Sequence, residues 1–147
     1  MPVAVALHVL AVVVWVGGMA FALLVLRPGL AALAPQQRIA VLARVFARFL
    51  PLVGVAILVI VGSGAALLMG LPGLRAAGWG VHVMTGVGAV MIVVYAVLWL
   101  RLNPRLQRAA AASDWPGAAA VAESMRRGVL VNLVLGIVVI VAAIVGR

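Results

Sequence analysis

The sequence predicts an all-α integral membrane protein, a bundle of four transmembrane helices with both termini on the outer side of the membrane. Three observations support this fold class. Hydrophobic residues make up 68% of the 147 residues and the mean hydropathy is +1.37, which is more apolar side chain than a soluble domain of this length can bury. Four apolar segments are long enough to cross a bilayer, and most of the few charged residues flank them.

The four predicted spans are residues 3–26, 49–70, 79–100 and 129–146. A helix needs about 20 residues to cross the hydrocarbon core. We expect the first span to be a retained helix rather than a signal peptide, because no basic region precedes it and Pro35 follows the cleavage-like sequence 32–34. We also expect residues 36–48 to extend the second helix and residues 117–127 to lead helically into the fourth. The whole chain is then one transmembrane domain, residues 1–147.

Arginine sets the expected orientation. The chain has a net charge of +9, with 11 arginines, no lysine, and only Asp114 and Glu123 as acidic residues. Four arginines lie in the first connection, one in the second and five in the third. By the positive-inside rule the first and third connections are cytoplasmic, so the N-terminus and C-terminus face out. In this setting the charge indicates contact with lipid headgroups in a cytoplasmic (inner) membrane, not with nucleic acid.

The two histidines, His8 and His82, are the strongest candidates for a functional site. Each lies a few residues inside the outer end of an apolar span, and the predicted topology brings both to one depth. An imidazole is costly in hydrocarbon, and it titrates near neutral pH and ligates metals. The alternative is a hydrogen-bonded structural histidine. With no cysteine, the chain can hold no thiolate zinc site, iron–sulfur cluster or c-type haem.

A pair of neutral imidazoles above small residues is the ligand set for haem b, which would serve electron transfer. Below His8, the same face of the first helix carries Trp15 and Gly18. Gly86 lies below His82, where a flat macrocycle would need space. These small residues are equally typical of ordinary helix packing. Near the outer surface, Arg75 and Trp79 are placed to meet the haem propionates.

Copper is the main alternative cofactor. Met1, Met69 and Met84 lie in the same leaflet as the histidines, and thioether and imidazole groups suit Cu(I). Packing is the simpler role for methionine in so apolar a chain. The two acidic residues fall in a cytoplasmic connection, so any enzyme here would be an oxidoreductase whose cofactor performs the reaction.

The first helix resembles that of the copper resistance protein D (CopD-like) membrane family, in which a histidine is followed by Trp-x-Gly-Gly and then Arg-Pro. Here the matching residues are His8, Trp15-Val16-Gly17-Gly18 and Arg27-Pro28, while Gly62-Ser63-Gly64 and His82 look similar too. The layout more distantly resembles the HemJ-type protoporphyrinogen oxidase, with a histidine where that family has another basic residue in helix 3. The resemblance implies copper handling or haem redox chemistry, with quinone, copper or superoxide as electron partner. A homodimer is an open alternative.

Overall fold

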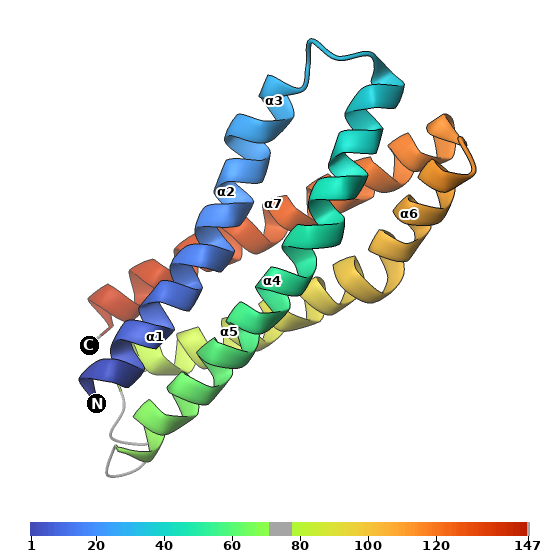
Figure 1. Ribbon diagram of the computed structural model, residues 1–147. Coiled ribbons are helices and arrows are strands. Elements are labelled where there is room, and N and C mark those ends of the chain that lie inside the picture. Colours follow the sequence, from blue (N-terminus) through green and yellow to red (C-terminus); the bar gives the residue numbers. More distant parts are fainter. Residues whose placement is uncertain (71–77, 147) are drawn as a thin grey trace.

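The computed structural model describes residues 1–70 and 78–146, and there the chain forms four long helices (Figure 1). These continuous helices are Pro2–Gly29, Pro35–Met69, Trp79–Ala111 and Trp115–Val145, all long and apolar enough to span a membrane. The predicted four-helix membrane architecture is confirmed, and the chain is a multi-pass membrane protein. Arg75 lies outside the described residues.

Short π-helical turns divide two of the four helices. The first helix comprises α1 (Pro2–Val12), η1 (Val13–Gly17), α2 (Gly18–Phe21), η2 (Ala22–Leu26) and α3 (Arg27–Gly29). The second helix is α4 (Pro35–Met69). The third comprises α5 (Trp79–Val97), η4 (Leu98–Leu102) and α6 (Asn103–Ala111), and the fourth is α7 (Trp115–Val145).

The helix starts follow ordinary capping rules. Proline occupies the first turn of α4, where its missing N–H removes no hydrogen bond. The Asp114 side chain accepts a hydrogen bond from the Gly117 N–H at 3.0 Å and caps α7. Between α6 and α7 the chain reverses direction through Ser113, which has a positive φ of 56°.

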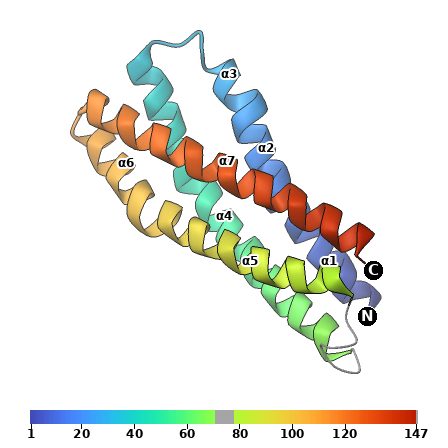
Figure 2. The same cartoon turned by 180° about the vertical axis from the view of Figure 1, so that it is seen from behind.

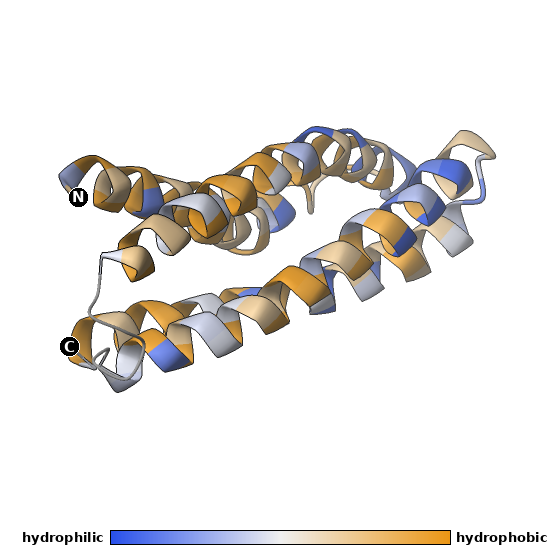
Figure 3. Ribbon diagram, turned by 90° about the horizontal axis from the view of Figure 1, so that it is seen from below, coloured by the Kyte–Doolittle hydropathy of each residue, from blue (hydrophilic) through white to orange (hydrophobic). Residues whose placement is uncertain are grey.

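The helices are longer than the apolar spans, as expected for residues 36–48 and 117–127. Helix α4, with 35 residues, is about 52 Å long at about 1.5 Å per residue, against a hydrocarbon core of about 30 Å. Hydrophilic residues gather at the end away from the termini (Figure 3). We call this the arginine end, and the end that holds both termini the terminal end (Figure 1).

Helix α7 makes the widest set of contacts. It lies along α5 and α6 and also touches α2 and α4 (Figure 2), while α1 pairs with α4. The core fills the middle of the bundle and the arginine end, where Leu106, Ala118 and Met125 are completely buried. At the terminal end packing is sparser, and residues 81–90 of α5 include no buried side chain.

Hydrogen bonds from polar side chains to backbone carbonyls join the helices in the middle of the bundle. The Tyr95 hydroxyl donates to the Leu50 carbonyl at 2.8 Å, and its ring packs edge-on against Trp15 and Trp99. One turn earlier on α5, the Met91 carbonyl accepts a hydrogen bond from the Asn132 amide at 3.1 Å. Such hydrogen bonds fix which faces of apolar helices meet, because the hydrophobic effect does not distinguish them in lipid.

Candidate functional site

The ring of His8 lies in the interface between α1 and α4. Its Nδ1 is 3.0 Å from the Ser63 hydroxyl oxygen, and the imidazole also stands close to Gly64, where a Cβ atom would meet Cε1 at 3.4 Å. A methyl group at this position would make only an ordinary van der Waals contact with the ring. Ser63 is 8% exposed, so this is a partly buried contact between two helices and not a chance surface contact.

The direction of this hydrogen bond follows from the proton of the Ser63 hydroxyl. A serine has one hydroxyl proton to donate. The Ser63 oxygen is 2.5 Å from the Val59 carbonyl and 3.2 Å from the Ile60 carbonyl, and both of these groups can only accept. The serine proton goes to them, as hydroxyls in helices commonly bond to the preceding turn. The serine oxygen then accepts from His8, whose Nδ1 donates.

This hydrogen bond selects one form of the imidazole. With the proton on Nδ1, the neutral ring presents the lone pair of Nε2, and no residue in the described ranges hydrogen-bonds to that atom. Histidines that ligate metals commonly have this arrangement, in which a fixed partner on one nitrogen orients the other. The structure therefore shows a hydrogen-bonded histidine, as in the structural alternative, whose Nε2 has no partner among the described residues.

His82 lies at the same end of the bundle, as the topology required, but on a different surface. The side of α5 that packs on α7 carries Gly80, where a Cβ atom would collide with the Ala142 carbonyl. His82 is two residues further on, nearly opposite on a helix, and is exposed. It shares its face with Val93, three turns away and 63% exposed. Within one chain the structure does not bring the two imidazoles together.

The other sequence-predicted residues have different surroundings. Trp15 is buried against Tyr95, and the space in front of Gly18 is taken by the Phe49 ring. Gly86 lies on the exposed face of α5, where a Cβ atom would meet nothing within 4 Å, and Trp79 is 57% exposed. These four residues do not line one cavity.

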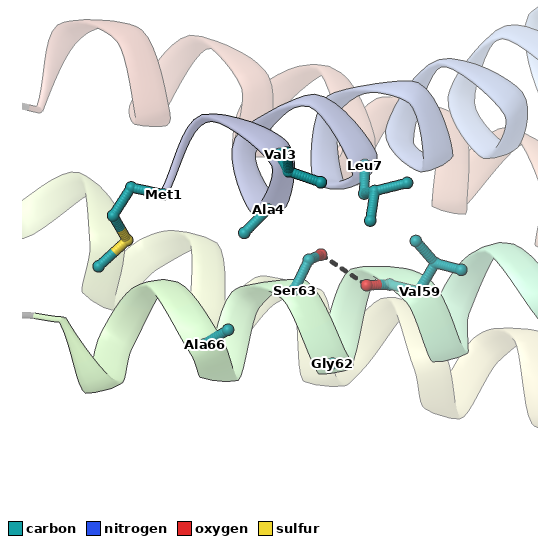
Figure 4. Close-up of a pocket in the computed structure, with 8 residues that line it drawn as sticks. All are labelled: Met1, Val3, Ala4, Leu7, Val59, Gly62, Ser63 and Ala66. Atoms are coloured by element: carbon teal, nitrogen blue, oxygen red, sulfur yellow. Dashed lines mark hydrogen bonds between the residues drawn. The ribbon is translucent and has the colours of Figure 1, made fainter.

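A groove of about 540 Å³ runs along the α1–α4 pair at the terminal end. It is shown in Figure 4 and is lined by Met1, Val3, Ala4, Leu7, Val59, Gly62, Ser63 and Ala66. The Met1 side chain reaches across to α4 and lies against Gly70. Ser63, the partner of His8, is the polar side chain among the lining residues.

Ser63 was not predicted from the sequence as the partner of His8. The similar depth of the two residues in the membrane could have indicated the contact. Ser63 stands six residues before the end of α4, and His8 stands six residues after the start of α1. In the described ranges there is no group of three or more His, Asp or Glu side chains that could hold a metal. A metal here would therefore rely on imidazole with softer or fewer ligands.

The family of the chain is decided by a match over most of its length. The family model described as Copper resistance protein D matches residues 43–145. The chain belongs to this family. The predicted CopD-like membership is confirmed. The match begins after His8 and the Trp-x-Gly-Gly motif and includes Ser63 and His82. No curated protein and no solved structure matches the chain, and the resemblance to HemJ-type oxidases stays a prediction.

Proposed function

We propose that this CopD family member handles copper at the terminal end of the bundle, with Nε2 of His8 as the principal ligand. The observation that carries the proposal is the hydrogen bond from His8 to a serine whose own proton is already committed. It keeps the proton of the neutral imidazole on Nδ1, which leaves the lone pair of Nε2 for a metal. Copper is the cargo in this proposal, in line with the copper-related family.

The surroundings of His8 favour Cu(I). Imidazole and thioether groups are ligands that suit this ion, and carboxylates, which favour harder cations, are absent from the described part of the terminal end. Met1 and His8 are seven residues apart, so they lie on one side of the helix at depths that differ by about 10 Å. We infer that copper binds at two successive positions, first at the Met1 thioether at the outer end of the groove and then at His8 further in.

Copper binding to His8 is testable on the detergent-purified protein by competition with a chromophoric Cu(I) chelator. We expect the unmodified protein to hold copper near one equivalent and His8→Ala to lose this binding. His82→Ala is the matched control, since it removes the other imidazole from an exposed face, and its affinity should stay within about twofold. Equal losses in both variants, or none in His8→Ala, would refute the assignment.

Haem b, with electron transfer to copper, superoxide or a quinone, is the second candidate. The same observation favours it, because a neutral imidazole with a free Nε2 is also the form that ligates haem iron. His82 faces outward, so the second axial ligand would come from outside the chain, for example from His82 of a second copy. Absorption spectra before and after dithionite reduction separate the candidates. A Soret band that disappears in His8→Ala supports haem, and its absence after haem-replete expression rejects it.

A further inference from the structure

Three half-buried arginines meet at the arginine end, where the first helix, α4 and α7 come together. Arg27, Arg38 and Arg126 are partly buried, whereas the other arginines of the described ranges are exposed. Arg27 donates to the Ala122 carbonyl at 3.4 Å, which joins α3 to α7. Arg27 is also close enough to Arg38 and Arg126 to be repelled by both. From the sequence, the arginines indicated orientation and contact with headgroups, but no signal showed that these three lie near one another.

The charges in this cluster do not balance. Glu123 is its single carboxylate, and Arg126 contacts both of its oxygens, with bonds of 2.8 Å from Nε to Oε2 and 2.6 Å from Nη2 to Oε1. The exposed Arg127 also donates to Oε1, at 3.3 Å. Arg27 is left 3.7 Å from Glu123. The three half-buried guanidinium groups therefore share one negative charge, a formal excess of two positive charges.

Arg38 has a donor that the protein leaves unused. Its Nη2 donates to the Ala31 and Leu33 carbonyls, at 3.1 Å and 3.3 Å, which fixes the side chain against the connection before α4. Its Nε is buried and has no partner in the described ranges. Buried N–H groups are normally satisfied, and an unpaired one costs about 1–3 kcal/mol.

We propose that this cluster binds the phosphate group of an anionic phospholipid. Guanidinium groups pair readily with phosphate oxygens, and a phosphate beside this cluster would offset the excess charge of Arg27, Arg38 and Arg126. The position selects a lipid rather than a soluble anion. Arg27 directly follows the first apolar span and Arg126 stands shortly before the fourth, so both lie at the depth of the headgroups.

Native mass spectrometry of the purified protein with short-chain phosphatidylglycerol tests the proposal. We expect Arg38→Gln and Arg27→Gln to weaken lipid binding about fivefold each, the equivalent of ~1 kcal/mol per arginine near a lipid surface. Arg105→Gln, which removes an exposed arginine from α6, is the matched control and should change binding less than twofold.

The variant Glu123→Gln distinguishes a lipid-binding cluster from a purely structural one. Removing the competing carboxylate frees Arg126 and Arg27, so phosphatidylglycerol should bind more tightly than to the unmodified protein, a gain that misfolding cannot imitate. Phosphatidylcholine, with no net charge, and inorganic phosphate, with no acyl chains, are the comparison ligands. Equal binding of phosphatidylcholine, equal binding of inorganic phosphate, or weaker lipid binding in Glu123→Gln would each overturn the proposal.

Discussion

The sharpest prediction concerns Ser63→Ala, which removes the partner of His8 and leaves His8 in place. Loss of a hydrogen bond to a metal-ligating histidine typically weakens metal binding about 10- to 100-fold. That range equals about 1.4–2.7 kcal/mol. The stability of the bundle should fall much less, by about 0.6 kcal/mol, because hydrogen bonds between membrane helices contribute little on average. Copper affinity and folding stability should therefore separate.

The assay for Ser63→Ala pairs Cu(I) competition with thermal unfolding of the same preparation. Thr85→Ala is the matched control, since the Thr85 hydroxyl also donates to the preceding turn, at 2.8 Å to the Val81 carbonyl, but lies exposed on α5. We expect this control to bind copper like the unmodified protein. A Ser63→Ala variant whose copper affinity is unchanged within about twofold would show that the hydrogen bond does not position a ligand.

Two further predictions concern packing in the middle of the bundle. At Gly54 a Cβ atom would come within 2.5 Å of the Trp99 ring, so Gly54→Ala should cost about 1–3 kcal/mol, whereas Gly62→Ala, with nothing within 4 Å, should leave thermal stability unchanged or raise it. Asn132→Leu loses the bond to the Met91 carbonyl but removes a buried oxygen without a described partner, so stability should hold or rise by about 1 kcal/mol. Thermal unfolding measures the stability of each variant. A large loss of stability in Asn132→Leu, or no loss in Gly54→Ala, would contradict these expectations.

The sequence was sufficient for the spans and helix starts because the signals are local. Runs of apolar residues must cross the bilayer as helices, since lipid offers backbone groups no hydrogen bonds. The start of α7 is equally local, because the Asp114 carboxylate satisfies an N–H group in the first turn of the helix. The placing of His8 and His82 at the same end of the bundle followed from the alternating direction of the four helices.

The rotation of each helix about its axis was beyond the sequence. Helix α5 is apolar on nearly every side, so no contrast between faces showed that Gly80 would turn toward α7 and His82 away from it. The close approach at Gly80 depends on the shape of α7 near Ala142, a long-range property. For the same reason Gly18 was assigned space for a ligand that Phe49 occupies.

The surplus length of α4 has a practical consequence. Residues 35–48 precede its apolar span, so about 20 Å of this helix extends past the hydrocarbon core on the arginine side. In a supported bilayer, α4 of each copy would protrude from one surface of the membrane and not from the other. Height imaging by atomic force microscopy could then read the insertion direction of single molecules without a tag or an antibody.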